Sequence, residues 1–311
     1  MNSTLALLSQ FPIRKTRKQK QVFLEAVQYE MHRQGYTSKV EKGRFGCRNL
    51  VIGESESAQY LVTAHYDTCA RLPVPNLCTP CNAALSFVIQ LLLIGFFAVV
   101  YLCIVNAGIL LFTDHRFSAL LGILFVLFLN YLMLAGPANK NNYNDNTSGV
   151  AALLEIARSL PENQRGNVCF VLFDLEEAGL IGSASYRRKH KKATDKQVVL
   201  NLDCVGDGDE ILLFPTKHLK KSKTKMRPLY QCCGYFGKKS ILVKDKGFYF
   251  YASDQRNFPY GVGIASLKRG KWGLYLDRIH TDKDTMLDET NINILRAAIV
   301  SLICCNAVKK G

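Results

Sequence analysis

Histidine and carboxylate side chains follow a series of short apolar segments along this chain of 311 residues. Three of those segments, residues 59–64, 167–173 and 197–202, have the length and composition of buried β-strands. The candidate residues that follow these segments, or lie in turns farther along, are His65, Asp67, Asp145, Glu176, Glu177, Asp203 and His280. Binding sites of open α/β sheets form at the carboxyl ends of the strands, so we expect these side chains to lie close together.

A cluster of this composition predicts a bound cation. Carboxylates that are brought together repel one another and lose hydration, and a metal ion removes that cost. Imidazole and carboxylate donors without cysteine are typical of zinc, and less often of manganese or cobalt. Each residue alone is more often part of a turn, a helix cap or a solvated surface. Their occurrence in this order, each at the end of an element, favours the metal site.

The elements that must position these residues alternate along the chain. Besides the three strands named above, the pattern predicts strands at residues 46–53 and 261–267 and helices at residues 18–34, 149–160 and 291–306. This alternation predicts an α/β fold with a mostly parallel central sheet flanked by helices. We expect residues 1–83 and 136–311 to form one catalytic domain.

An almost purely apolar stretch, residues 84–135, interrupts that domain. It contains two uncharged segments, residues 85–112 and 117–135, each long enough to cross a bilayer as a helix. Only residues 113–116 separate them, so we expect an inserted transmembrane helical hairpin with a short tip. Uncharged runs of this length are seldom core helices of soluble domains.

The charge distribution predicts the partner and the side of the membrane. The net charge of +15 favours an anionic partner, and because the sequence contains no nucleic-acid-binding module, we expect a lipid bilayer and no nucleic acid. Basic residues are concentrated at 14–20, 187–192 and 217–225, whereas the tip has one arginine. We therefore expect a two-helix cell-membrane protein with its catalytic domain and both termini in the cytoplasm. Eleven cysteines in no regular framework agree with a reducing compartment.

The motifs resemble those of the M28 family of zinc peptidases. The resemblance rests on Thr-Ala-His-Tyr-Asp at 63–67, Asn-Asp-Asn-Thr-Ser-Gly at 144–149, Asn-Leu-Asp at 201–203, the run 173–183 and the segment 280–285. It extends from about residue 59 to the C-terminus apart from the hairpin. It implies a metallopeptidase of the aminopeptidase type, a hydrolase that uses two zinc ions per chain. The set of motifs is specific as a group.

The resemblance also implies which residues bind the metal ions. Asp145 would bridge the two ions. His65 and Asp203 would complete one site, and Glu177 and His280 would complete the other.

Two further roles follow from the same resemblance. Asp67 would hold the ring of His65 and fix its tautomer. Glu176 would be the general base and acid of the reaction. Because adjacent residues of an extended chain point in opposite directions, we expect Glu177 to face the metal and Glu176 to face the substrate.

The chain departs from the family between His-x-Asp and the bridging aspartate. Soluble relatives have a short loop there, whereas here the segment is residues 68–144 and contains the hairpin. We therefore expect the rim of the site to lie near the bilayer and the peptide substrate to be membrane-associated. Cys78 and Cys81 form a Cys-x-x-Cys pair with no second pair at metal-binding spacing, so their role stays open.

Two alternatives to a peptidase stay open. One is a single-zinc enzyme similar to glutaminyl cyclases, although the run 176–183 is more similar to the peptidase branch. The other is a membrane protein of this superfamily without catalysis, against which the complete set of ligand positions argues. Asp254, Tyr249, Tyr251 and Tyr260 could line the pocket or pack in the core.

Overall fold

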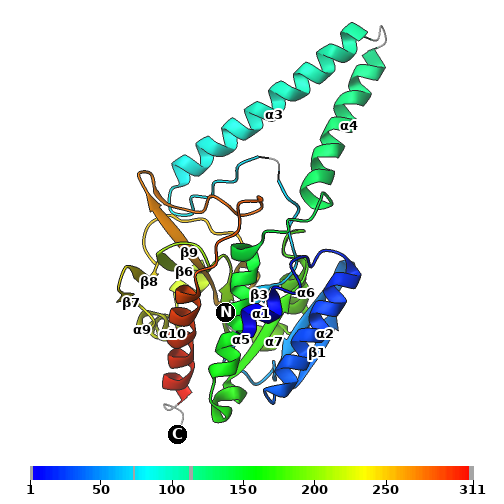
Figure 1. Cartoon of the computed structure of the whole chain (residues 1–311). Coiled ribbons are helices and arrows are strands. Elements are labelled where there is room, and N and C mark those ends of the chain that lie inside the picture. Colours follow the sequence, from blue (N-terminus) through cyan, green and yellow to red (C-terminus); the bar gives the residue numbers. More distant parts are fainter. Residues whose placement is uncertain (1–2, 73, 112–114, 308–311) are drawn as a thin grey trace.

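A ten-stranded sheet forms the centre of the protein (Figure 1). The computed structural model describes residues 3–72, 74–111 and 115–307. The strand order is β1-β2-β4-β3-β5-β9-β6-β8-β7, with β10 paired to β9. The strands are β1 (Ser38–Lys42), β2 (Arg48–Ile52), β3 (Tyr60–His65), β4 (Val168–Phe173), β5 (Val198–Leu202), β6 (Glu210–Pro215), β7 (Gly234–Phe236), β8 (Lys239–Val243), β9 (Gly261–Gly270) and β10 (Gly273–Tyr275).

The sheet has a parallel centre and antiparallel additions on both sides. Strands β4, β3, β5 and β9 pair in parallel, whereas β1, β2 and β6 join their neighbours toward the centre in antiparallel pairs. The predicted α/β fold is confirmed, and the antiparallel additions make the sheet as a whole mixed. The sequence analysis did not predict β1, β6, β7, β8 or β10. Several of these are short or half-exposed edge segments, such as the three-residue β7 and the charged β1.

The three central strands end at one edge of the sheet. Every residue of β3, β4 and β5 is buried, as expected for strands covered on both faces. The register pairs His65 with Phe173 of β4, and Thr63 with Asn201 of β5. The carboxyl ends of all three strands therefore meet, and the residues that follow them are brought together.

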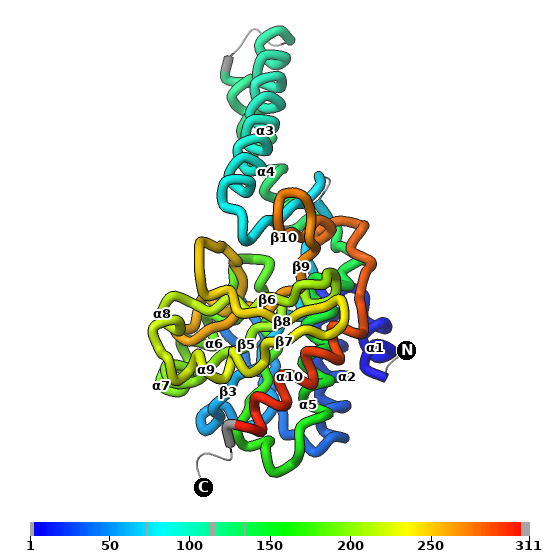
Figure 2. Tube along the Cα trace, turned by 90° about the vertical axis from the view of Figure 1, so that its left-hand side faces the viewer, coloured from blue at the N-terminus to red at the C-terminus, as the bar shows by residue number. Residues whose placement is uncertain are grey.

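Helices cover both faces of the sheet (Figure 2). The larger helices are α2 (Arg17–Arg33), α5 (Gly149–Ser159), α6 (Ile181–Lys189), α9 (Lys223–Gln231) and α10 (Glu289–Ala307). The shorter ones are α1 (Ser3–Leu8), α7 (Lys191–Thr194), α8 (Lys217–Lys220), η1 (Arg44–Gly46), η2 (Tyr143–Ser148), η3 (Glu162–Asn167) and η4 (Asp254–Asn257). Residues of α2, α5 and α10 form the main core with one face of the sheet, and Tyr186 of α6 packs on the other face.

The predicted helix at residues 18–34 is confirmed as α2. Thr16 and Gln19 form a capping box at its start, in which each side chain bonds the other's backbone N–H. Gly35 follows its last turn with φ of +82°, a conformation that glycine adopts without strain. Phe23 and Val27 are fully buried, as the helical spacing of the apolar residues predicts.

Two long apolar helices project from the rest of the molecule (Figure 1). They are α3 (Ala83–Leu111) and α4 (His115–Leu134), and both are long and apolar enough to cross a membrane. The helices approach each other at small residues, because a Cβ on Gly108 would contact Ser118 and one on Gly122 would contact Tyr101. Residues 113 and 114 of the predicted tip, and residue 112 at the end of the first predicted segment, lie outside the described part of the chain.

Backbone hydrogen bonds tie both ends of the hairpin into the catalytic domain. On the way to α3, Ala70 pairs with Ala138, and Cys78 pairs with Leu276 through two bonds of 2.8 Å. Arg71 N–H also donates to the carbonyl of Pro137, at 2.8 Å. The segments that enter and leave the hairpin are therefore part of the ordered domain. The division at residues 84 and 135 stays a prediction.

A buried arginine joins the N-terminal segment to the loops around the hairpin. Arg14 is 1% exposed, and its guanidinium donates to the carbonyls of Tyr66 and Phe11 and to the side chains of Asn142 and Thr147. Burial lowers its pKa to about 10, against the opposing charge of Asp67, so the group stays charged at neutral pH. This contact had no signal in the sequence.

We expect Arg14→Met to lower the free energy of unfolding by about 2–4 kcal/mol, because four acceptors, two of them in buried hydrogen bonds, lose their donor. Chemical denaturation in mild detergent, followed by circular dichroism, measures the change. Arg17→Met is the matched control, since Arg17 is exposed and the structure gives its side chain no ion pair among the described residues. Equal stability of the two variants would contradict the assigned role.

Candidate metal centre

All seven predicted site residues converge at the carboxyl edge of the central strands. His65 is the last residue of β3, Asp203 follows β5 directly, and Glu176 and Glu177 follow β4. Asp145 lies in η2, immediately before α5, and its peptide bond to Asn146 is cis. The remaining two residues also lie in loops: Asp67 is two residues beyond β3 and His280 follows β10.

Asp145 contacts both histidines, one with each carboxylate oxygen. Its Oδ1 lies 3.1 Å from Nε2 of His65, and its Oδ2 lies 2.9 Å from Nε2 of His280. The same nitrogen of His65 lies 3.7 Å from Oδ1 of Asp203, and that of His280 lies 3.3 Å from Oε2 of Glu177. The donor atoms thus form two groups that share Asp145.

The spacing of these atoms fits zinc. Zinc binds nitrogen and oxygen donors at about 2.0–2.2 Å in tetrahedral geometry, which places neighbouring donors about 3.4 Å apart. The four distances from a histidine Nε2 to a carboxylate oxygen in these groups are 2.9–3.7 Å. Both histidines present Nε2 to the centre of the cluster. In addition, Oε1 of Glu177 is buried and has no hydrogen-bond partner among the described residues.

Glu176 and Glu177 face the same cluster, contrary to the expectation that they point in opposite directions. Donor atoms of both lie within 4.8 Å of each other and of His65. The expectation was wrong because the chain is not extended here: the N–H groups of Gly179 and Leu180 both bond the carbonyl of Glu176 in a turn. The turn allows two adjacent carboxylates to serve one site.

Asp67 holds the backbone of the two glutamates. Its carboxylate accepts hydrogen bonds from the backbone N–H groups of Glu176, at 3.1 Å, and Glu177, at 3.3 Å. Its distance to Nδ1 of His65 is 3.6 Å, which is an ion-pair distance rather than a hydrogen bond. Burial opposes the charge of Asp67, but the contact with His65 lowers its pKa. The predicted orientation of His65 by Asp67 stays a prediction.

Two supporting residues hold Asp145 and the strand ends. Asp284 accepts hydrogen bonds from the N–H groups of Asn144, at 2.8 Å, and Asp145, at 3.0 Å. Asn146 donates to the carbonyl of Leu202 and accepts from Gly149 N–H, so it joins the end of β5 to the start of α5. Both lie in the family motifs, which was the only signal of their importance. Sequence reasoning assigned them no role.

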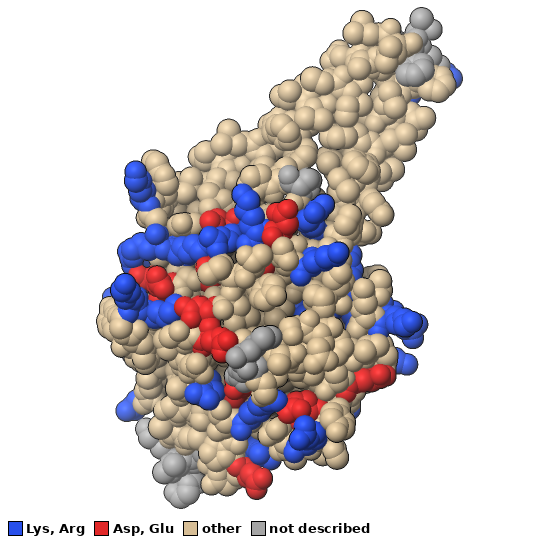
Figure 3. Space-filling view, viewed as in Figure 1, with Lys and Arg blue, Asp and Glu red and all other residues tan. Residues whose placement is uncertain are grey.

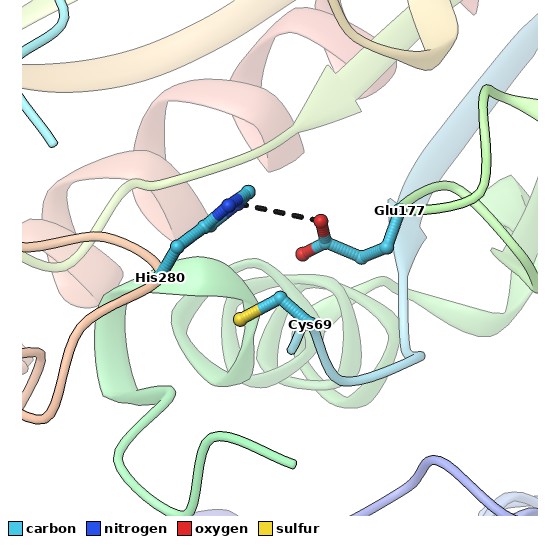
Figure 4. Close-up of side chains that lie close together, drawn as sticks. All are labelled: Cys69, Glu177 and His280. Carbon is cyan, nitrogen blue, oxygen red and sulfur yellow. Dashed lines mark ion pairs between the residues drawn. The ribbon is translucent and has the colours of Figure 1, made fainter. Parts of the chain in front are cut away.

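The sequence analysis also missed a thiol beside the second donor group. Figure 4 shows Cys69, Glu177 and His280 around a common space, and their donor atoms lie within 4.8 Å of one another. Cys69 is buried and could offer a fourth donor there. By contrast, Cys78 and Cys81 pack against the apolar cluster around Leu276, and neither belongs to a group of candidate metal donors in the described residues.

Of the four residues left open beside the site, Asp254 and Tyr251 reach it. Asp254 is fully buried, and neither carboxylate oxygen has a hydrogen-bond partner among the described residues. Burial raises its pKa to about 7, against the opposing charge of His65. Tyr251 donates its hydroxyl to the carbonyl of Asp203 at 3.0 Å. The other two tyrosines have partners elsewhere: Tyr249 donates its hydroxyl to the carbonyl of Pro215, and the ring of Tyr260 packs against His218.

The pKa shifts of the clustered side chains indicate a site that favours positive charge. Burial raises the pKa of Glu176, and burial together with Asp145 raises that of Glu177 to about 8. Burial alone would lower the pKa of His280, but the charges of Glu177 and Asp145 raise it to about 10. The same competition raises the pKa of His65, mainly through Glu176 and Asp145. The raised pKa values show that these groups favour bound protons, whose positive charge reduces the repulsion between the carboxylates. A metal ion at the same place would supply more positive charge.

A protein-family model described as peptidase family M28 matches residues 135–302. The chain belongs to peptidase family M28. The resemblance of its motifs to this family is thus confirmed, and the family is one of peptidases. Histidine and carboxylate donors of the kind grouped here are typical of zinc sites. No curated protein matches the sequence.

Solved structures of low sequence identity share the fold of this M28 protein. A glutaminyl cyclase of Porphyromonas gingivalis has a TM-score of 0.62 at 15% identity, covering 97% of this chain and 96% of that one. A zinc-dependent exopeptidase of Parabacteroides distasonis has a TM-score of 0.57 at 16% identity, covering 97% and 95%. The LapA aminopeptidase of Legionella pneumophila has a TM-score of 0.55 at 13% identity, covering 96% and 68%.

We expect the zinc affinity of this M28 protein to rise steeply from about pH 6 to pH 8. Glu177 and His280 have raised pKa values, so they hold protons in this range and must release them when zinc binds. Each displaced proton changes the affinity about tenfold per pH unit. Competition with a chromogenic chelator measures it.

Asp145→Asn is the matched control, because it removes the charge shared by both donor groups and should weaken binding at every pH. An affinity of the unaltered protein that does not change with pH would contradict the assigned donors.

Proposed function

We propose that the protein is a membrane-anchored aminopeptidase that binds two zinc ions, one at His65, Asp145 and Asp203 and one at Asp145, Glu177 and His280. The observation that carries the proposal is the placement of the two oxygens of Asp145 against two different histidines, at 3.1 and 2.9 Å. Manganese or cobalt could replace zinc at donors of this type.

The ions, when bound, supply an activated water and polarise the scissile carbonyl. The protein supplies a base for that water. Glu176 lies in the same cluster as His65 and Glu177, and burial raises its pKa. A carboxyl group with a raised pKa is a stronger base, so it can take a proton from water and return it to the leaving amine. Asp67 holds Glu176 in place through its backbone N–H.

The hairpin supports a site at a membrane. Its two ends continue into the segments that carry Asp67 and Asp145, and the segment before α3 also bonds the carbonyl of His280 through Leu72 N–H, at 2.8 Å. We infer that α3 and α4 span the bilayer and that the substrate is a peptide that reaches the site at the membrane surface. Lys15 donates to the carbonyl of Gly136 just after α4, so a basic side chain marks that boundary.

A glutaminyl cyclase is the second candidate, favoured by the fold shared with the enzyme of Porphyromonas gingivalis. That alternative needs one zinc ion. Two groups of donors share Asp145, one with His65 and Asp203 and the other with Glu177 and His280. The presence of two groups favours the two-zinc peptidase.

We expect Glu176→Gln to retain zinc and to lower kcat by about 10²–10⁴-fold, because it removes the proton acceptor and keeps the metal donors. Elemental analysis of the purified protein gives the metal content, and release of N-terminal residues from a set of short peptides gives the rate. Glu162→Gln is the control, since Glu162 is exposed on η3.

Further outcomes of the same assay separate the candidates. Two zinc ions with release of N-terminal residues support the aminopeptidase, whereas one zinc ion with cyclisation of N-terminal glutamine supports the cyclase. With the protein reconstituted into lipid vesicles, a peptide held in those vesicles by a C-terminal lipid anchor should be cleaved with a higher kcat/KM than the free peptide. Equal values would contradict delivery of the substrate at the membrane.

We expect the soluble part to be cytoplasmic, since basic residues are concentrated outside the hairpin and remain on the cytoplasmic side of membranes. A reporter active only in the cytosol should work when fused at the C-terminus and fail when inserted between residues 113 and 114. Activity of the inserted reporter would overturn the topology, and an inserted reporter active only outside the cytosol is the reciprocal control.

A further inference from the structure

The tip of the β9–β10 hairpin is fixed to the start of α3. The tip consists of Lys271 and Trp272, between the paired residues Gly270 and Gly273. The side chain of Asn82 accepts a hydrogen bond from Leu85 N–H, which caps α3, and donates to the carbonyl of Trp272, each at 3.0 Å. The side-chain amide of Asn82 therefore fixes the position of Trp272 relative to the first turn of α3.

A second loop brings exposed aromatic rings to the same place. The N–H group of Phe250 donates to the carbonyl of Pro80 at 2.9 Å, two residues before Asn82. Phe250 is 58% exposed, Phe248 is 65% exposed and Trp272 is 76% exposed. These three large rings are exposed to water, and hydrogen bonds hold Phe250 and Trp272 beside the segment that begins α3. We call Phe248, Phe250 and Trp272 the aromatic collar.

Positive charge accompanies these rings. The three segments that border the hairpin, residues 68–82, 135–144 and 268–283, contain seven Lys or Arg residues and two Asp residues. Arg71, Lys140, Lys271 and Lys283 have no ion pair among the described residues. Figure 3 shows Lys and Arg side chains in a band across the soluble part directly below the apolar hairpin.

We propose that the aromatic collar, with Lys271 beside Trp272, inserts into the headgroup layer of the bilayer that α3 and α4 cross, where it contacts anionic lipid. The inference rests on the proposed membrane span of α3 and α4. Tryptophan and phenylalanine with neighbouring lysine have the chemistry of the membrane–water interface, where an apolar ring is partly dehydrated and an ammonium group meets phosphate. Figures 1 and 2 agree that the β9–β10 hairpin reaches the base of α3.

Docking of the collar would orient the metal centre. From Gly273 the chain continues through Leu276, which pairs with Cys78, to His280, whose carbonyl accepts from Leu72 N–H. His280 adopts φ of +61°, a strained conformation for an L-residue that such fixed neighbours must maintain. The lipid surface, the start of α3 and one metal ligand are therefore connected by short, hydrogen-bonded segments. The collar would hold the opening of the site at a constant height above the membrane.

The sequence contains a single tryptophan, so intrinsic fluorescence reports on Trp272 alone. We would reconstitute the full chain into vesicles of phosphatidylcholine and phosphatidylglycerol and quench with lipids brominated near the headgroup or deep in the acyl chains. Shallow bromines should reduce the emission of Trp272 at least about twofold more than deep bromines, as expected at the interface. Replacing phosphatidylglycerol with phosphatidylcholine should weaken this quenching.

Two variants calibrate depth in a Trp272→Phe background. Tyr29→Trp introduces a ring on exposed α2 and should respond only to aqueous iodide. Leu102→Trp introduces one on an exposed position within α3 and should be quenched most by deep bromines.

If the Leu102→Trp variant is quenched by lipid while Trp272 behaves like the Tyr29→Trp variant, the collar does not dock and the membrane span stands. If neither is quenched by lipid, the membrane span of the proposed function is wrong, and the docking proposal is overturned with it. Emission of Trp272 that is equally quenched with and without phosphatidylglycerol would overturn the part assigned to anionic lipid.

Discussion

The carboxylate of Asp145 is the contact on which the site depends. Its two oxygens face His65 and His280, which come from positions more than two hundred residues apart in the sequence. Each histidine has a further carboxylate partner, Asp203 or Glu177. A buried carboxylate shared in this way is costly unless positive charge lies on both sides, so the cluster is stable either with protons on its histidines or with cations.

The fold around Asp145 keeps that geometry. Asp284 accepts from the N–H groups of Asn144 and Asp145, and Asn146 joins the end of β5 to the start of α5. The parallel register of β3, β4 and β5 brings the remaining donors to the same edge. None of these bonds uses one of the donor atoms, so they position the donors independently of a metal, which is how a protein limits the reorganisation required for catalysis.

The apolar hairpin enters the chain between two parts of this constellation, after Asp67 and before Asp145. In a soluble enzyme such an insertion could be a detached appendage. Here the Ala70–Ala138 and Cys78–Leu276 pairs connect the segment before α3 to the domain by backbone pairing. Arg14 in addition donates to Tyr66 and Asn142, on the two sides of the hairpin in the sequence. Ordered, hydrogen-bonded segments therefore join the hairpin to the metal centre, so the position of the hairpin and that of the site are coupled.

The sequence alone determined the family motifs, the candidate donors and the two apolar helices, because each depends on local composition and on residues that end an element. It also determined the parallel centre of the sheet, since β3, β4 and β5 are short and mostly apolar. The tertiary structure decided what depends on distant contacts: the antiparallel edge strands, the buried Arg14, the thiol of Cys69 beside Glu177, and the turn that directs Glu176 and Glu177 to one cluster. Such features have no local signal, because burial, register and the direction of a side chain are fixed only when segments far apart in the chain pack together.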